Sequence, residues 1–254
     1  MSDRRELFQI TGRPQISVAF PSGRLSVRTG GDDAVEVTVT GRRADEFEIG
    51  QVGSTISVRY EGRGIAGGSH HVDLVVPSST RLDMAGASVD VDVERVDELE
   101  VRLASGDIRA GEVDGDVSLK TASGDANLGK VTGRISVASA SGDVIVERAE
   151  GDCSLTTVSG DIDIQIALHD LITKSVSGDV KVAQFDGSRF SSKTMSGDVS
   201  VTVPRGRIID IDLISRSGRC KVPEEASSPF EGERKHVDIT CKSVSGDIKI
   251  GTYG

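Results

Sequence analysis

Six aspartates recur in this sequence at a spacing that could place their carboxylates in one row. Each ends a Ser-Gly-Asp triplet; five of the triplets follow one another every 18 residues, and the sixth comes after 19. The aspartates are Asp107, Asp125, Asp143, Asp161, Asp179 and Asp198. Carboxylates stacked at the spacing of neighbouring strands repel one another unless they are hydrogen-bonded, screened or bridged by a cation such as Ca²⁺. The row is therefore the first candidate metal site.

The composition of the triplets nevertheless favours a structural role. Calcium-binding nine-residue repeats have the form G-G-x-G-x-D-x-U-x, whereas each unit here has one glycine and usually one aspartate. Glycine in the middle of a triplet can adopt a positive φ without steric cost, and the Ser and Asp side chains can bond neighbouring amides in a turn. We therefore predict that the aspartates serve the turns and that the protein binds no metal and no cofactor.

Other residue patterns give little support for catalysis. None of the motifs G-x-S-x-G, H-E-x-x-H and G-x-x-x-x-G-K-[ST] occurs. Solenoid hydrolases and lyases need a carboxylate cluster in a groove beside long loops, and the turns predicted here are short. His70 and His71 are adjacent, so in a strand they point to opposite faces and form a poor metal pair. His169 takes the place of a turn glycine, which suits a residue type enriched in the left-handed region. We predict that the protein is not an enzyme.

The residues between the triplets define the elements that must position them. A looser turn lies midway between triplets, so each 18-residue unit holds two strands with apolar residues at every second position. The apolar columns are Leu99/Val117/Ile135/Cys153/Leu171, Val101/Leu119/Val137/Leu155/Thr173, Ile108/Ala126/Val144/Ile162/Val180/Val199, Ala110/Leu128/Val146/Ile164/Val182/Val201 and Val113/Val131/Ala149/Ala167/Phe185. Columns of this kind form when identical positions lie above one another and share one core. We predict an all-β fold, a flattened parallel β-solenoid (β-helix) with two strands per 18-residue coil, right-handed by the usual crossover rule.

The repeat does not extend over the whole chain. Residues 1–80 are predicted to form an irregular N-terminal β region that caps the solenoid, with strands at 16–20, 25–27, 35–39, 56–60 and 72–76 and a loop at 62–68. Residues 81–254 form the solenoid, with regular coils over 99–203 and looser coils over 204–254. There a loop at 223–232 precedes a strand at 245–250 that closes the stack. Cys220 and Cys241 fall at inward positions of opposite strands. Two packed free thiols are the favoured arrangement there, and a disulfide between them is the alternative.

Composition narrows the classes of partner and the compartment. The net charge of −10 argues against nucleic-acid binding, and an aromatic content of 3% without tryptophan leaves few stacking platforms for bases or sugars. The N-terminus shows no secretory signal, and no apolar run could span a bilayer as an integral membrane segment. Three cysteines do not make a disulfide framework. We therefore expect a cytoplasmic protein.

One outward face of the solenoid is small, smooth and poor in charge. Its most suggestive residues, each directly before a triplet, are Ala122, Ala140, Val158, Val176 and Met195. Flat faces of this kind can dock on another surface, so we predict an interaction face for a protein partner or a second copy of the chain. The first hypothesis is a non-enzymatic scaffold that binds a protein partner. The alternatives are a homo-oligomer or filament former, whose solenoid ends offer unpaired strands, and a calcium- or glycan-binding surface.

The Ser-Gly-Asp-[Ile/Val] ladder at 18-residue spacing also resembles a known family. Together with the irregular β lead-in and the final strand Val-Ser-Gly-Asp-Ile-Lys-Ile at 244–250, it is similar to the DUF4097 family, also called "putative adhesin" or toastrack domains. The resemblance covers essentially the whole chain. It implies a parallel β-solenoid without established catalytic residues, in a family linked by context to bacterial envelope-stress systems.

Overall fold

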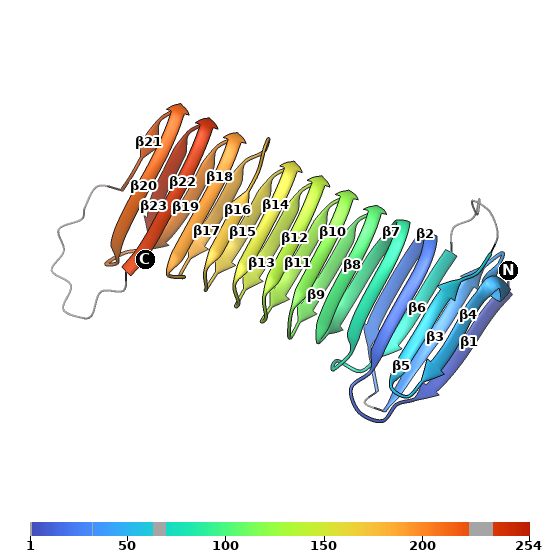
Figure 1. Ribbon diagram of the computed structural model, residues 1–254. Coiled ribbons are helices and arrows are strands. Elements are labelled where there is room, and N and C mark those ends of the chain that lie inside the picture. The colour runs from blue at the N-terminus through green and yellow to red at the C-terminus, as the bar shows by residue number, and fades with distance from the viewer. Residues whose placement is uncertain (1, 32, 63–69, 224–235) are drawn as a thin grey trace. The chain divides into compact units, whose positions relative to one another are not determined.

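The computed structural model describes residues 2–31, 33–62, 70–223 and 236–254 (Figure 1). These residues form twenty-three strands and one short 3₁₀ helix, η1 (Ala44–Glu46), with no α-helix among them. The chain divides into two compact units, residues 1–129 and 130–254. The predicted all-β class is confirmed, and within each unit most neighbouring strands pair in parallel, as the solenoid requires.

The N-terminal unit contains regular coils whose strands pair 18 residues apart. Its strands are β1 (Ser2–Gln9), β2 (Gln15–Thr29), β3 (Ala34–Gly41), β4 (Phe47–Val52), β5 (Thr55–Tyr60), β6 (His70–Val76), β7 (Arg81–Val96), β8 (Glu98–Ser105), β9 (Ile108–Val113), β10 (Val117–Ser123) and β11 (Ala126–Val131), which crosses into the second unit. In β10 and β8, Val117 pairs with Leu99 and Leu119 with Val101. The first half of β7 pairs with β8 and its second half with β9, so β7 supplies both sides of one coil.

Strand β2 forms a further coil inside the region predicted to be irregular. It runs parallel to β7 from the pair Gln15↔Arg81 to the pair Val27↔Val93. Ser22 therefore lies beside Ser88, and Gly23 has a φ of 132°, as at the corners of the repeat. The parallel ladder thus begins before residue 81, and residues 30–80 are an insertion between two coils.

The insertion surrounds β2 with strands of mixed direction. On the side opposite β7, β2 pairs in parallel with β5 and with β6. Beyond these, β4 is antiparallel to β5, β3 is antiparallel to β6, and β1 is antiparallel to β3. The strand positions predicted in residues 1–80 are confirmed, except that the strands at 16–20 and 25–27 are one continuous strand, β2; β1 and β4 were not predicted. The loop predicted at 62–68 lies, except for Gly62, outside the described residues.

The C-terminal unit contains the most regular coils. Its strands are β12 (Ile135–Ser141), β13 (Val144–Ala149), β14 (Cys153–Ser159), β15 (Ile162–Ala167), β16 (Leu171–Lys174), β17 (Val180–Phe185), β18 (Arg189–Ser196), β19 (Val199–Pro204), β20 (Ile208–Ser217), β21 (Cys220–Lys221), β22 (His236–Ser245) and β23 (Ile248–Tyr253). The single 19-residue spacing has its extra residue in the second turn, because Ala167 pairs with Phe185 at a separation of 18 and Leu171 with Phe190 at 19.

The last strands in the sequence are not the last strands in the stack. Strand β22 pairs with β18 on one side and with β20 on the other, and β23 likewise lies between β19 and β21 (Figure 1). The prediction that residues 245–250 close the stack is therefore wrong: β20 and β21 form the terminal coil. Most of the loop predicted at 223–232 lies outside the described residues.

All residues of the five predicted apolar columns are buried, which confirms the shared core. A further buried column was not predicted, because its members are hydroxyl residues. It contains Thr121, Ser139, Thr157, Ser175, Thr194 and Ser243, one position before the outward residues of the predicted interaction face. Thr121 and Ser139 donate to the carbonyls of Ser123 and Ser141. Each hydroxyl residue therefore lies two positions before the serine of a Ser-Gly-Asp corner.

The two turns of each coil use glycine differently. Every Ser-Gly-Asp glycine has a positive φ, between 115° at Gly142 and 152° at Gly246, as predicted. No described residue other than glycine has a positive φ, so the expectation that His169 is left-handed is wrong. In the second turn, glycine allows a close approach to the preceding coil: a Cβ on Gly187 would lie 2.2 Å from the carbonyl oxygen of His169. His169 shows that another residue can occupy this position in its own coil.

The cysteines are all free thiols. Burial raises the pKa of Cys153 and of Cys241 to about 12, so both stay protonated at neutral pH. Cys220 pairs in register with the buried Ile248, yet it is exposed because β21 belongs to the terminal coil. The predicted inward position of Cys220 is therefore confirmed by its register, but the side chain is not buried, and the two cysteines are not bonded.

Candidate interaction surface

The triplet aspartates form hydrogen-bonded columns, one coil on the next. In the N-terminal unit, Asp90 accepts the amide N–H of Asp107, and Asp107 accepts that of Asp125, each at 3.2 Å. In the C-terminal unit, Oδ1 atoms of Asp143, Asp161, Asp179 and Asp198 accept the amide of the next triplet residue at 2.7–2.8 Å. Each carboxylate thus holds the following corner in place.

This geometry explains how carboxylates can stack without a cation. An amide donor offsets the repulsion within each column, and at the last corner Asp247 accepts the amide of Arg219 at 2.8 Å. Among the described residues no three His, Cys, Asp or Glu side chains come together as a potential metal site. The arrangement fits the predicted turn role of the aspartates.

Calcium is expected to leave the thermal unfolding midpoint unchanged, because Oδ1 of five of the six ladder aspartates already accepts a backbone amide. The measurement is differential scanning calorimetry with calcium chloride and with EDTA. The control is Asp179→Asn, which retains an Oδ1 acceptor for the amide of Asp198 and removes one charge from the column. A calcium-dependent rise of several degrees that Asp179→Asn abolishes would show that the column is a metal site.

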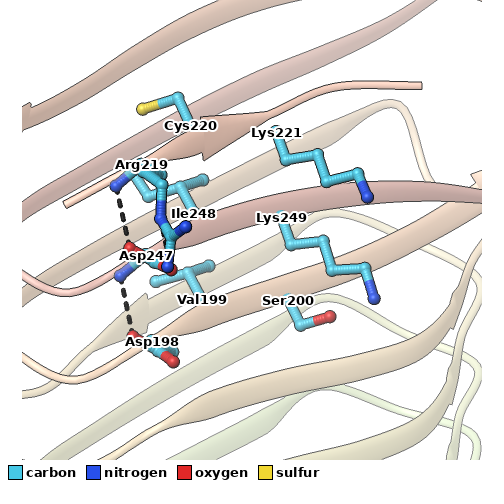
Figure 2. A pocket seen from close by; sticks show the side chains of 9 residues that line it. All are labelled: Asp198, Val199, Ser200, Arg219, Cys220, Lys221, Asp247, Ile248 and Lys249. Atoms are coloured by element: carbon cyan, nitrogen blue, oxygen red, sulfur yellow. Dashed lines mark hydrogen bonds and ion pairs between the residues drawn. The ribbon is translucent and has the colours of Figure 1, made fainter. Parts of the chain in front are cut away.

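A hollow of about 590 Å³ lies against the terminal coil (Figure 2). Nine residues line it: Asp198, Val199, Ser200, Arg219, Cys220, Lys221, Asp247, Ile248 and Lys249. Lys221 and Lys249 are register partners, and their side chains extend side by side in Figure 2. Arg219 forms an ion pair with Asp247, with 3.6 Å between Nε of Arg219 and Oδ2 of Asp247. The lining contains no histidine, and no hydrogen bond joins Ser200 or Cys220 to a carboxylate or a lysine among the described residues.

The two adjacent histidines point to opposite faces, as predicted. His71 is exposed, whereas His70 is only 2% exposed and packs against the rings of Phe47 and Tyr60 at 5.3 and 5.0 Å. Neither ring nitrogen of His70 has a hydrogen-bond partner among the residues that the structure describes. Burial lowers the pKa of His70, so the ring is neutral at pH 7. His70 is a core residue of the N-terminal unit.

The predicted interaction face is exposed in both units. In the N-terminal unit it consists of small residues, with Ala122 beside Ala104. In the C-terminal unit it becomes a ridge of larger side chains: Val158, Val176, Met195 and Val244 are 50, 42, 57 and 47% exposed. Val244 extends the predicted set, because the pairs Thr194↔Ser243 and Ser196↔Ser245 place it beside Met195.

The apolar ridge is defined here as Ala140, Val158, Val176, Met195 and Val244. Register places Ala140 beside Val158, because Ser139 pairs with Thr157 and Ser141 with Ser159. The amides of Ser177 and Ser196 donate to the carbonyls of Val158 and Val176, which keeps the next coils aligned. The ridge is therefore built on backbone pairing, with neighbouring side chains about 4.8 Å apart.

A column of lysines runs parallel to the ridge. Lys174 pairs in register with Lys193, and Lys193 with Lys242. Lys242 forms an ion pair with Asp212, with 3.9 Å between Nζ and Oδ2. Lys174 and Lys193 form no ion pair within the described ranges. Like charges directly opposite each other on a sheet are destabilising. The lysine column was not predicted, although its members occupy equivalent positions in successive coils.

These features define a class: a parallel β-solenoid with aspartate-held corners and an exposed apolar ridge. The family model Toastrack DUF4097 matches residues 8–167 and 150–252, and the chain belongs to this family. The resemblance noted from the sequence is thereby confirmed. Among curated proteins, none matches the chain.

Solved structures of low sequence identity are similar to this chain. A "putative adhesin" from Parabacteroides distasonis is 14% identical, with a TM-score of 0.55 and coverage of 98% of this chain and 97% of that one. A "putative adhesin" from Bacteroides fragilis is 9% identical, with a TM-score of 0.42 and coverage of 99% and 97%. The first of these supports the solenoid fold. Within the described ranges, no helix has the length and apolar character needed to cross a membrane.

Proposed function

We propose that this protein is a non-enzymatic interaction scaffold that presents the apolar ridge to a protein partner. The observation that carries the proposal is the exposure of four stacked large apolar side chains, Val158, Val176, Met195 and Val244. Scattered single apolar residues are ordinary on a surface, whereas a contiguous row is typical of a binding site. Backbone pairing between coils makes the row rigid, so binding costs little ordering of the scaffold.

The lysine column indicates the chemistry of the partner. Lys174 lies two residues before Val176, and Lys193 lies two residues before Met195. Side chains two residues apart in a strand point to the same face, so the lysines share the outward face of the ridge. A partner with acidic residues beside an apolar strip would cover the ridge and neutralise the lysines. The net charge of −10 makes this local positive column distinct from the rest of the chain.

Membership of the Toastrack family supports a non-enzymatic role. The adhesin names carried by related structures are consistent with binding rather than catalysis. The proposal includes a cytoplasmic location and a place in an envelope-stress system, both taken from the sequence-based expectations. Their test is fractionation of the native host before and after envelope stress.

The binding test uses a double variant, Val158→Glu with Met195→Glu, as bait in affinity capture from the native host. The matched control is Ile145→Glu, an exposed apolar residue in β13 of the same unit. Wild type and control are expected to retain a common partner that the double variant loses, while circular dichroism and the unfolding midpoint stay unchanged. Equal recovery of that partner by a folded double variant would contradict the proposal.

A further inference from the structure

We propose that the terminal coil of the C-terminal unit, formed by β20 and β21, is a self-association surface through which two copies of this chain pair about a two-fold axis. This surface is separate from the apolar ridge. The proposal rests on the strand edge, the open core and the charge pattern of β20.

The first observation is an unpaired edge. Strand β20 pairs with β22 from Ile208↔His236 to Ser217↔Ser245, and β21 pairs with β23. No strand in the described part of the chain pairs with the other side of β20 or β21. A ten-residue edge on which no described strand pairs is a template for another strand.

The second observation is that the core is open at this coil. Ile211 is in register with Ile239, a buried core residue, yet Ile211 is 40% exposed. Ile209 and Leu213 occupy the same inward face and are only partly buried, although their register partners Val237 and Cys241 are buried. Another layer placed on this coil would remove these side chains from water, which favours association.

The outermost strands of the N-terminal unit also have a side on which no described strand pairs, but they lie over a closed core. There, among the described strands, β1 pairs with β3 alone and β4 with β5 alone, and Arg4–Glu6 and Arg5–Glu36 ion pairs line β1. The apolar residues of β3 beneath β1 are fully buried. Pairing of such a surface with its own copy gives a closed dimer, whereas a filament needs two complementary surfaces.

The third observation is that β20 is complementary to itself only when two copies run antiparallel. An antiparallel pair centred on Leu213 places Asp210 opposite Arg216 twice and Asp212 opposite Ile214 twice. A parallel pair in register would stack aspartate on aspartate, which is destabilising. Arg216 is exposed and has no ion pair with any residue that the structure describes. The second copy would supply one.

The test is sedimentation velocity of the purified full chain over a wide concentration range. Wild type is expected to sediment as a species of twice the 26.7 kDa chain mass. Arg216→Asp turns two attractions into two repulsions and is expected to weaken the dimer about tenfold or more. The charge swap Asp210→Arg with Arg216→Asp is expected to restore it, because the opposed charges are again unlike.

Two controls separate this proposal from the proposed function. Arg59→Asp, at an exposed position of β5, changes the net charge equally and is expected to leave the dimer intact. The double ridge variant is also expected to dimerise normally. A monomer at every concentration, species that grow beyond a dimer, failure of the charge swap to rescue, or loss of the dimer in the ridge variant would each overturn the proposal.

Discussion

Replacing Gly178 with alanine is expected to lower the unfolding free energy by about 3 kcal/mol or more and the midpoint by about 6–12 °C. Gly178 has a φ of 140°, a region that side chains rarely adopt. A Cβ there would lie 2.1 Å from the carbonyl oxygen of Gly160 on the adjacent coil. Because that neighbour is backbone, relief requires the two corners to separate, and the amide of Gly160 then loses its bond to the carbonyl oxygen of Ser177.

The matched control is Gly251→Ala in β23 of the same unit. Gly251 does not have a positive φ, and its added methyl would make ordinary contacts with Thr202 at 3.5 Å. This variant is expected to unfold within about 0.5 kcal/mol of wild type. Urea titrations of both variants provide the measurement, and equal stability of the two would show that the corners do not depend on glycine.

Replacing Phe190 with alanine is expected to cost about 3–5 kcal/mol, the range for a fully buried phenylalanine. Phe190 and Phe185 flank the second turn that carries the extra residue, and their rings lie 5.7 Å apart in the core. The substitution leaves a cavity that the paired backbones cannot collapse, because β18 is held by β16 and β22 on its two sides. Urea titration measures the loss.

Two further variants test whether the cost comes from packing. Phe190→Leu keeps most of the apolar volume and is expected to lose much less stability than Phe190→Ala. Val52→Ala removes an apolar side chain that is 84% exposed and is expected to have almost no effect. An alanine variant as stable as the leucine variant would indicate that the coil rearranges around the turn.

The solenoid was predictable because each apolar column repeats at one fixed spacing. Leu155 and Ile164, for example, are recognisable as core residues by comparison with their equivalents one coil away. The coil formed by β2 could not be found in this way, since a long insertion separates it from β7. The stacking order of β20 and β22 could not be predicted either. The spacing of the repeats along the chain does not determine that β22 lies between β18 and β20.

The interaction surface was partly predictable. Ala122, Ala140, Val158, Val176 and Met195 stood out because each precedes a triplet, and the structure places all five on the exposed face. That these residues bind a partner stays a prediction. Val244 belongs to the same ridge but lies beyond the loosened repeat. The buried hydroxyls, such as Thr157, were missed because threonine and serine read as surface residues when their surroundings are unknown.

The position of β22 and β23 has a consequence for synthesis on the ribosome. The segment 208–221 emerges before residues 236–253, yet its pairing partners in the described structure are β22 and β23 alone. Until β22 has been synthesised, Ile209, Ile211 and Leu213 lack the strand with which they pair. Folding from the N-terminus can therefore proceed coil by coil only as far as β19. The last two coils must then form together, once the final strands have left the exit tunnel.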